Sequence, residues 1–361
     1  MENATALSNH RPQTRVAIVG AGPFGIELAV ALKRNRIPFE IFDAGPIGKT
    51  ISWWAPQTRW FSSNDRIAIA GVPLMTPDQA KATREQYLTY LRGIVTQFGI
   101  HVRCYQPVID IRREQSGFTV VSETPGGPSE LACEAVVLAV GGLGHARRLG
   151  IEGEDLPHVD GYLREPHRYY GRKVLIIGGR NSAVEAALRL HHAGAEVSLS
   201  YRGQQLPKDD IKYWLYPELR GLIQASKITA YLGTRPIRIT SSHVVLESSE
   251  PAKRATQTTV AAEEVLTLIG YEQDKTLFHK AGVELVEDAQ RPLVDEATLE
   301  TNVPGIYVGG TAVAGTQSSR YRIFLENCHR HVDQILAHLT GNVAVPSDAT
   351  FQRQIESAPE S

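Results

Sequence analysis

Three glycines and an acid near the N-terminus have the types and spacing needed to bind a dinucleotide. Gly20, Gly22 and Gly25 are spaced G-x-G-x-x-G between an apolar run at 15–19 and an amphipathic helical pattern. In such a loop the first glycine permits a tight turn, the second admits a pyrophosphate, and the third lets the helix pack on the strand. Asp43 ends the next apolar run, where a carboxylate accepts hydrogen bonds from ribose hydroxyls. The stretch therefore predicts a dinucleotide whose phosphates lie at a helix N-terminus.

A second loop of the same kind begins at Gly178 and carries different charges. Arg180 stands at the middle glycine position, and the following strand ends in Tyr201 and Arg202 instead of an acid. A carboxylate there binds the ribose 2′-hydroxyl of NAD, whereas an arginine accommodates the 2′-phosphate of NADP. Arg202 therefore predicts NADPH, and Arg180 is a candidate phosphate contact. A solvated surface arginine is the alternative for both.

The hydrophobic pattern supplies the elements that position these loops. Helical periodicity follows each loop, at 23–33 and 184–192, and apolar strands precede them at 15–19 and 173–177. From residue 100 the period changes to two, which predicts strands at 101–112, 118–122 and 131–141 with a turn at 125–128. Three strand ends run into glycines, at 139–144, 265–270 and 306–310, where open α/β sheets bind ligands. We expect an α/β protein with two Rossmann-like three-layer domains.

Further elements are predicted by local signals. An amphipathic helix is expected at 77–98, with Thr83 and Gln86 forming a capping box. Short strands are expected at 228–232, 237–239 and 244–247, an aromatic helix-like segment at 204–223, a hairpin loop at 248–259 and a final helix at 319–338. Three tryptophans between residues 53 and 60 suit either the wall of a flat ring or the edge of a core.

Composition excludes several functional classes. Apolar residues make up 42% and charged residues 21% of the 361 residues, and the formal net charge is −1, so no nucleic-acid or anionic-membrane partner is indicated. The polar N-terminal residues form no signal peptide, and no apolar run approaches the ~20 residues of a membrane span. We expect a cytoplasmic protein.

The three cysteines, Cys104, Cys133 and Cys328, are far apart in the sequence. Without a C-x-x-C pair, neither a metal site nor a local redox dithiol is predicted, and a buried cysteine is usually a small apolar side chain.

The chain resembles flavoproteins with two dinucleotide-binding domains of the thioredoxin-reductase architecture, and most closely the bacillithiol-disulfide-reductase (YpdA-type) family. The segments that carry this resemblance are 152–158, 177–187 and 301–307, and the likeness extends from about Arg15 to Ala337. It implies FAD on the first loop, NADPH on the second, and a C-terminal segment that completes the FAD domain. The family places a cysteine next to the flavin in its glycine loop, where this chain has Phe24. Phenylalanine cannot attack a disulfide as a thiolate does.

Pattern and resemblance together predict the residues of both sites. The FAD contacts expected are Gly20, Gly22, Pro23, Phe24, Gly25, Asp43, Ala44, Trp54, Asn64, Val108, Ala139, Gly141, Gly310, Thr311 and Ala312. The NADPH contacts expected are Gly178, Gly179, Arg180, Asn181, Ser182, Tyr201, Arg202 and Gly270. The flavin itself is the reactive group, and no catalytic side chain is assigned.

The domain plan places FAD on 14–155 plus 290–345 and NADPH on 156–289, with a mobile arm at 1–13 and a mobile tail at 346–361. The expected activity is an FAD-dependent transfer of hydride from NADPH to flavin and then to a small-molecule acceptor, of which a low-molecular-weight disulfide is the first candidate. A flavin monooxygenase or oxidase is the second, although Glu165 replaces the histidine of the monooxygenase fingerprint. A non-enzymatic flavin redox sensor is the third, and homo-oligomers are possible.

Overall fold

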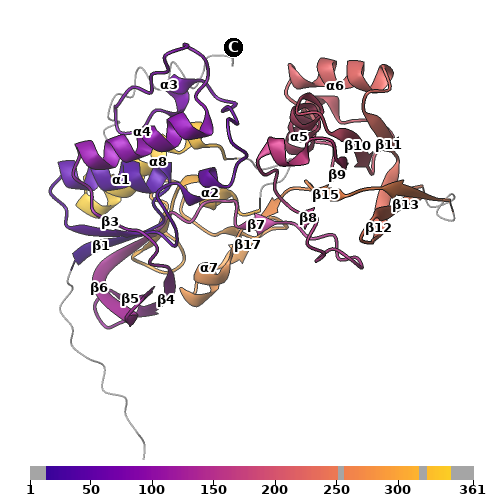
Figure 1. Ribbon diagram of the computed structural model, residues 1–361. Helices are drawn as coiled ribbons and strands as arrows, with labels where there is room; N and C mark the ends of the chain where they lie inside the picture. The colour runs from indigo at the N-terminus through magenta and orange to yellow at the C-terminus, as the bar shows by residue number, and fades with distance from the viewer. Residues whose placement is uncertain (1–13, 251–255, 317–322, 343–361) are drawn as a thin grey trace, which may run out of the picture. The chain divides into compact units, whose positions relative to one another are not determined.

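The computed structural model describes residues 14–250, 256–316 and 323–342. The chain divides into two compact units (Figure 1). The first contains residues up to Ser52, Gln57–Gly144 and the chain from Gln273 onward, and the second contains Trp53–Pro56 and His145–Glu272. The expected arm at 1–13 and tail at 346–361 lie outside the described residues.

The sheet of the first unit is built around the strand that precedes the first glycine loop. Its strand order is β3-β2-β1-β6-β5-β4, and β19 pairs with β6. The strands β1, β2, β3 and β19 are parallel to their neighbours, whereas β4, β5 and β6 form an antiparallel meander. Their bounds are β1 Thr14–Val19, β2 Phe39–Phe42, β3 Val102–Arg103, β4 Val108–Arg113, β5 Phe118–Thr124, β6 Gly127–Leu138 and β19 Ile306–Val308.

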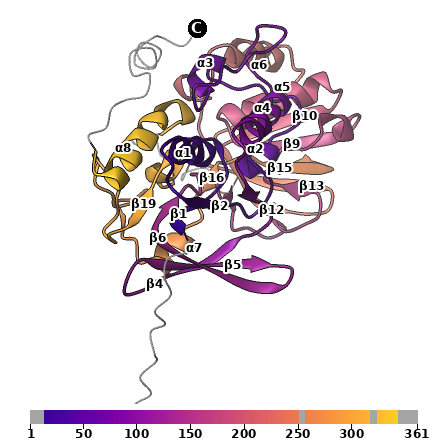
Figure 2. The ribbon, with the colours of Figure 1, turned by 90° about the vertical axis from the view of Figure 1, so that its left-hand side faces the viewer.

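Helices cover one face of this sheet. Helix α1 (Pro23–Arg34) packs beside α8 (His329–Thr340), and α4 (Arg84–Gln97) lies next to α1 (Figures 1 and 2). Strand β1 is buried along most of its length because both faces of a central parallel strand are covered. The smaller elements of this unit are α2 Lys49–Ser52, α3 Asn64–Ile67, α7 Thr276–Lys280, β17 Leu285–Val286 and β18 Arg291–Pro292.

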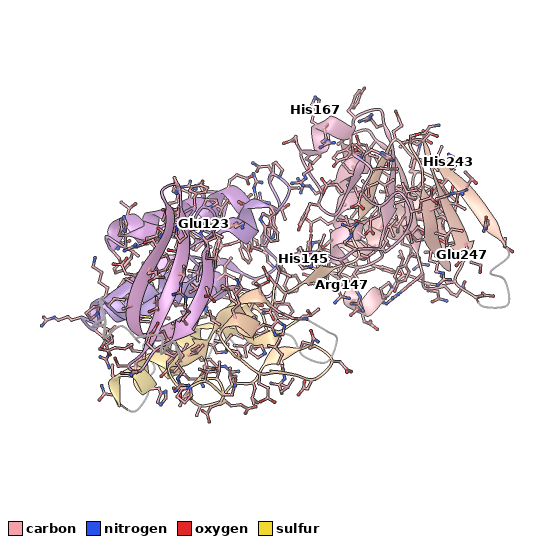
Figure 3. The ribbon with its side chains drawn as sticks, turned by 90° about the horizontal axis from the view of Figure 1, so that it is seen from below. Glu123, His145, Arg147, His167, His243 and Glu247 are labelled. Atoms are coloured by element: carbon pink, nitrogen blue, oxygen red, sulfur yellow. The ribbon has the colours of Figure 1, made fainter. Side chains whose placement is uncertain are left out.

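The second unit repeats the parallel arrangement. Its main sheet has the order β11-β10-β9-β15-β8, and every pair in it is parallel. A second, antiparallel sheet contains β12, β13 and β14, and Figure 3 labels His243 and Glu247 on β13. The bounds are β8 Val159–Asp160, β9 Lys173–Ile177, α5 Asn181–His192, β10 Glu196–Tyr201, α6 Leu215–Gln224, β11 Thr229–Leu232, β12 Thr234–Ile239, β13 His243–Ser248, β14 Gln257–Ala261 and β15 Glu264–Thr267.

The chain crosses between the units at 144/145 and at 272/273, earlier than the 155/156 and 289/290 boundaries expected from sequence. Residues after the first crossing pack on the second unit, because the Ile239 amide donates to the Glu152 carbonyl at 2.9 Å. Helix α7, after the second crossing, packs on β4 of the first unit. A two-stranded ribbon, β7 (His145–Ala146) with β16 (Tyr271–Glu272), belongs to the second unit, and Figure 3 labels His145 and Arg147 there.

Four predicted elements are wrong in their bounds. The helix-like segment expected at 204–223 has a 3-10 turn at Lys208–Asp210 and becomes α-helical only from Leu215. Helix α4 starts at Arg84, so residues 77–83 are not helical, although the Thr83 and Gln86 capping box is confirmed. The strand expected at 101–112 is two strands, β3 and β4, and the break contains Pro107, which has no N–H to donate to a ladder. The helix expected from 319 begins at His329, after a 3-10 turn at Leu325–Asn327, and residues 317–322 lie outside the described chain.

The other predicted strands and the second loop's helix are present, within a few residues of their expected ends. The hairpin loop expected at 248–259 is only partly described, because 251–255 lie outside the described residues and β14 already begins at Gln257.

Candidate functional site

The first glycine loop has the shape that a bound diphosphate requires. A Cβ atom at Gly20, whose φ is +116°, would lie 2.4 Å from the Ala139 carbonyl oxygen, and one at Gly25 would lie 2.0 Å from the Gly20 oxygen. Both positions therefore exclude any side chain. A Cβ at Gly22 would meet nothing within 4 Å. The loop is thus closely packed on its protein side and open at Gly22, where a pyrophosphate would approach the backbone.

The N-terminus of α1 faces the same loop with its backbone donors uncapped. Gly22 is the N-cap residue, Pro23 occupies the first turn, and no side chain caps the helix or places an acid in that turn. Proline suits this position because its missing N–H would have no helical partner. The remaining N–H groups and the helix dipole favour an anion. The chemistry of this terminus fits the phosphates of FAD.

Asp43 fixes the loop from the end of β2. Its Oδ2 accepts from the Ala21 amide at 2.8 Å, and its Oδ1 accepts from the Gly45 amide at 2.8 Å. Burial raises the pKa of Asp43, and the two backbone hydrogen bonds oppose that rise. Each carboxylate oxygen has a second lone pair, so the group can still accept a ribose hydroxyl while it holds the loop. Ala44 lies between Asp43 and Gly45 in this turn.

Two strand ends meet next to the loop. The strands β6 and β19 are parallel neighbours, so their carboxyl ends lie at one edge of the sheet. There the Gly142 amide donates to Thr311 Oγ1 at 3.1 Å, which joins the turn after β6 to the 3-10 turn Gly310–Ala314. Gln273 also joins these turns, because its Nε2 donates to the carbonyls of Gly141 and Ala312 at 3.1 and 2.8 Å. Sequence reasoning missed Gln273, which stands in no recognisable motif.

Phe24 is buried and packs on the returning C-terminal segment. A Cβ at Gly309 would clash with the Phe24 ring at 2.1 Å, and one at Gly310, whose φ of +71° already favours glycine, would make a tight 3.0 Å contact with the Phe24 Cβ. The ring also meets His331 edge-on, with centroids 6.2 Å apart. The Phe24 ring therefore helps to hold the glycine loop against the returning C-terminal segment; we call Phe24, Gly309, Gly310 and His331 the support beneath the loop.

His331 is neutral in this support. Its Nδ1 accepts from the Gly310 amide at 3.1 Å, so the ring's proton is on Nε2. Burial, together with the nearby Arg330 and His329, lowers the pKa of His331 to about 4.

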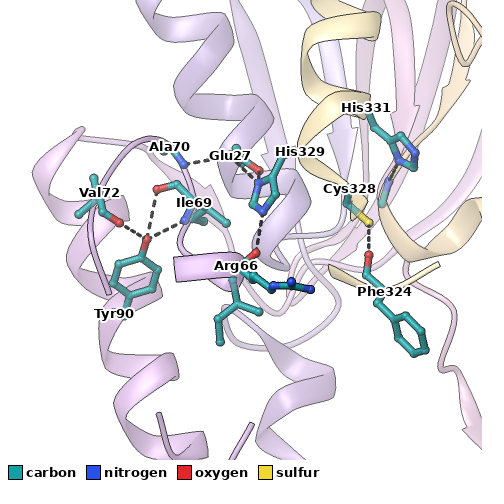
Figure 4. A network of polar contacts seen from close by, with 12 residues as sticks. Glu27, Arg66, Ile69, Ala70, Val72, Tyr90, Phe324, Cys328, His329 and His331 are labelled. Atoms are coloured by element: carbon teal, nitrogen blue, oxygen red, sulfur yellow. Dashed lines mark hydrogen bonds and ion pairs between the residues drawn. The ribbon is translucent and has the colours of Figure 1, made fainter. Parts of the chain in front are cut away.

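A second buried histidine, His329 at the start of α8, links this helix to α1 and to α3. His329 Nδ1 lies 2.9 Å from Glu27 Oε2, and its Nε2 lies 3.0 Å from the Arg66 carbonyl (Figure 4). Glu27 Oε1 accepts from the Ala70 amide at 3.0 Å, and Tyr90 reaches the same segment. Since Glu27 is on the helix that starts at the glycine loop, this network holds the loop's helix in place.

The cysteines show no reactive environment. Cys133 and Cys328 are buried, and burial raises the pKa of the Cys133 thiol to about 12 and that of the Cys328 thiol further still. Cys328 Sγ donates to the Phe324 carbonyl (Figure 4). Burial also raises the pKa of the half-buried Cys104. Thiolates attack disulfides, so none of these three has the properties of a nucleophile.

Other predicted FAD contacts have structural partners. Asn64 binds Thr76, Ala80 and Ala82, so its amide holds its own segment together. Val108 is the buried first residue of β4. Trp54 lies in Trp53–Pro56, which groups with the second unit, and its flavin contact stays a prediction. Of the other tryptophans, Trp60 packs on Tyr87 with centroids 4.5 Å apart, at the edge of the core.

The second glycine loop has the same backbone but different support. Gly178 has φ +142°, and a Cβ there would lie 2.3 Å from the Leu268 oxygen. The Tyr201 ring covers Gly179, where a Cβ would come within 2.4 Å of it. Asn181 accepts from the Lys212 amide at 2.7 Å, and Ser182 is exposed in the first turn of α5. Gly270, with φ +104°, accepts from the Arg147 amide at 3.0 Å.

The two arginines of this loop differ in their partners. Arg180, the N-cap of α5, makes an ion pair with Asp210 at 3.1 Å. Arg202 is exposed, and no hydrogen bond or ion pair of its side chain occurs within 14–250, 256–316 and 323–342. No acid lies in the first turn of α5. An exposed cation beside an uncapped helix N-terminus suits an anion such as the 2′-phosphate of NADPH.

In the part of the chain that the structure describes, no helix is long and apolar enough to cross a bilayer, and no group of three or more His, Cys, Asp or Glu side chains is arranged to hold a metal ion.

Comparisons with known proteins identify the family. The profile of the family described as pyridine nucleotide-disulphide oxidoreductase matches residues 17–310. The bacilliredoxin reductase Bdr of Bacillus subtilis (strain 168) is 32% identical over 327 residues, which cover 91% of this chain and 98% of that protein.

Solved structures give the same result and confirm the expected fold class. The bacillithiol disulfide reductase Bdr (YpdA) from Bacillus cereus has a TM-score of 0.84 at 29% identity, covering 91% of this chain and 99% of that one. The thioredoxin reductase of T. acidophilum has a TM-score of 0.69 at 17% identity over 91% and 98% of the chains, and shares the fold. The chain therefore belongs to the pyridine nucleotide-disulphide oxidoreductase family, is a homologue of the Bdr reductases, and is a flavoprotein oxidoreductase that uses FAD and NADPH.

Proposed function

We propose that FAD binds the first glycine loop, that NADPH binds the second, and that the enzyme reduces a small molecule of the low-molecular-weight disulfide class. The observation that carries the proposal is the difference between the two loops. Asp43 offers a carboxylate to a ribose diol, whereas the exposed Arg202 offers a cation to a 2′-phosphate. The Bdr relatives are named for bacilliredoxin and bacillithiol disulfide, which supports a disulfide acceptor.

The residues of this chain hold and orient the cofactors. Bound FAD supplies the chemistry, accepting a hydride from NADPH and releasing two electrons to an acceptor. Asp43, the α1 N-terminus and the two tied strand ends would hold FAD, and the α5 N-terminus with Arg202 would hold NADPH. The net reaction consumes NADPH, a proton and a disulfide, and yields NADP⁺ and two thiols.

Phe24 limits how the disulfide is reduced. The resemblance implies a cysteine at this position, and Cys104, Cys133 and Cys328, whose thiol pKa values are all raised by burial, are poor substitutes. Electrons must then reach the acceptor without a thiolate from this chain. The same observation favours a second candidate function, an NADPH oxidase in which oxygen is the acceptor, because that reaction needs no thiol.

Anaerobic mixing with NADPH in a stopped-flow instrument tests the proposal. We expect the absorption band of the flavin, at roughly 450 nm, to bleach. Absence of bleaching contradicts both candidates and favours a non-enzymatic flavin sensor. If the reduced enzyme is reoxidised by a small disulfide such as bacillithiol disulfide, the first candidate holds. Reoxidation by oxygen alone supports the second.

A cysteine-free variant sharpens this test. Cys104→Ser, Cys133→Ala and Cys328→Ala are combined, and disulfide-dependent reoxidation should continue unchanged. Loss of disulfide turnover, with NADPH bleaching intact, would show that one of these thiols takes part after all. The converse variant, Phe24→Cys with Gly309→Ala, places a thiol in the loop and fills part of the space that the ring leaves. A gain of disulfide turnover there identifies the thiol as the missing part.

The acceptor's class also bears on location and assembly. A small thiol–disulfide couple belongs to an aqueous compartment, so we place the enzyme in the cytoplasm, with no nucleic-acid or membrane partner and with homo-oligomers possible. Fractionation of the native host and sedimentation of the purified protein test these two statements.

A further inference from the structure

Gln273 is a buried amide at the point where the chain re-enters the first unit. It is the first residue after the crossing at 272/273, and only 3% of its surface is exposed. A buried carboxamide is costly unless both its N–H donors and its oxygen find partners. Its surroundings therefore show what this side chain does.

Both hydrogens of the Gln273 amide are used on the two strand ends. Nε2 lies 3.1 Å from the Gly141 oxygen and 2.8 Å from the Ala312 oxygen. Both partners are carbonyl oxygens, which can only accept, so the orientation of the amide follows from its neighbours. Gln273 thus ties the turn after β6 to the turn after β19, alongside the hydrogen bond from Gly142 to Thr311.

The amide oxygen is left over. Gln273 Oε1 is buried and has no hydrogen-bond donor within the described residues. A buried acceptor without a donor costs stability, and such groups are normally paired. The residues that hold this amide, Gly141 and Ala312, are the same strand-end residues that we assign to FAD. A hydrogen-bond donor from the bound cofactor would satisfy Oε1 and leave the two hydrogen bonds of Nε2 unchanged.

We propose that Gln273 is a positioning residue for FAD: its amide nitrogen ties the two strand ends and its oxygen accepts a hydrogen bond from the flavin half of the cofactor. The flavin half offers a ring N–H and ribityl hydroxyls, whereas the ADP half is assigned to the glycine loop and Asp43. The inference rests on the proposed location of FAD in the first unit, and it is independent of which acceptor the enzyme reduces.

The test compares Gln273→Met with a matched control, Gln334→Met. Gln334 lies on α8, its Nε2 donates to the Glu296 carbonyl at 2.7 Å, and its Oε1 also lacks a donor within the described residues. Both substitutions keep the side-chain length and remove the amide, but only Gln273 contacts the two strand ends. Apo protein is prepared from each variant, and the dissociation constants of FAD and of ADP are measured by fluorescence titration and calorimetry.

For Gln273→Met we expect FAD affinity to fall by about tenfold or more, since at least one hydrogen bond in a buried site is lost. ADP affinity should change by less than about twofold, and the absorption spectrum and midpoint potential of the bound flavin should shift. Gln334→Met should leave all four quantities unchanged. Gln273→Glu restores the oxygen but loses the donors, and should recover the flavin spectrum only in part.

Three outcomes overturn the inference. Equal loss of FAD and ADP affinity would show that Gln273 only joins the two strand ends and does not contact the flavin half of the cofactor. Unchanged FAD affinity and spectrum would mean that Oε1 meets only water. Equal effects in both methionine variants would show that the loss of any buried amide is enough. Failure of wild-type protein to bind FAD at all would instead contradict the assignment of FAD to this unit, and ADP binding by the same apo protein separates that case from misfolding.

Discussion

The two glycine loops share a backbone path and differ in what holds them and what they leave exposed. In the first, Asp43 is fastened to the loop through both oxygens, and the buried Phe24 packs beneath it on Gly309 and Gly310. In the second, the Tyr201 ring covers Gly179 and the cation of Arg202 remains exposed. The comparison teaches that two strand–turn–helix units with one backbone path can present opposite charges at the end of the second strand, which is where our proposal places a ribose diol in one unit and a 2′-phosphate in the other.

The largest effect should come from Gly25→Ala, which tests whether the first loop is as tightly built as its contacts indicate. The new methyl group would lie 2.0 Å from the Gly20 oxygen, so the helix must move away from the strand. We expect a loss of roughly 3 kcal/mol in unfolding free energy, together with loss of FAD. Thermal melting and flavin content of the purified variant measure both.

Gly22→Ala is the matched control, because its methyl group would meet no protein atom. The apo protein should melt at the wild-type temperature while FAD affinity falls. Equal melting of both variants and the wild type would contradict the packing argument.

The next effect concerns the support beneath the first loop and its dependence on pH. The pKa of His331 is lowered from 6.5 to about 4, so the unfolded chain binds more protons between these values. Stability therefore falls as pH drops through this window, by about 3 kcal/mol in all. His331→Gln keeps an acceptor for the Gly310 amide but has no titrating ring. The decrease in stability between pH 6.5 and pH 4 should therefore be smaller in this variant.

Urea unfolding at pH 7 and at pH 4 measures the difference, with His101→Gln, at an exposed histidine, as control. If the stability of His331→Gln falls with pH as steeply as that of the wild type, another group causes the decrease.

Arg202→Ala tests the second half of the comparison. Loss of a charge-assisted contact to phosphate should raise the KM for NADPH by about tenfold or more and change the KM for NADH little. Lys173→Ala serves as the control. Lys173 is the first residue of β9, at the end of that strand away from the glycine loop, and its replacement also removes one positive charge from the unit. Equal losses for the two cofactors in Arg202→Ala would refute a 2′-phosphate role.

The smallest effect is expected from Asp210→Asn. Asp210, which is half-buried, forms an ion pair with the exposed Arg180, and a pair that solvent reaches in this way contributes little to stability. Release of Arg180 should tighten NADPH binding by about two- to threefold without a change in melting temperature. Weaker NADPH binding would mean that Asp210 positions Arg180 instead of competing for it.

Much of the two loops could be predicted because their signals are local. The glycines, Asp43 and Arg202 lie in continuous strand–turn–helix stretches, where spacing along the chain determines spacing in the fold. The Thr83 capping box was predictable for the same reason. The N-terminal bound expected at 77 was wrong because the Thr83 cap marks the start of the helix, and residues 77–83 before it contribute nothing to the apolar stripe that begins at Tyr87.

The sequence by itself determined the class of protein, since two glycine fingerprints with different strand-end charges predict two dinucleotides. Only the tertiary structure decided what surrounds them: that Phe24 packs on Gly309 and Gly310, that His331 is a neutral acceptor, and that Gln273 ties two strand ends. These contacts join residues far apart in the chain. No local pattern encodes them, because a side chain's partners across the sheet depend on how distant strands and helices pack.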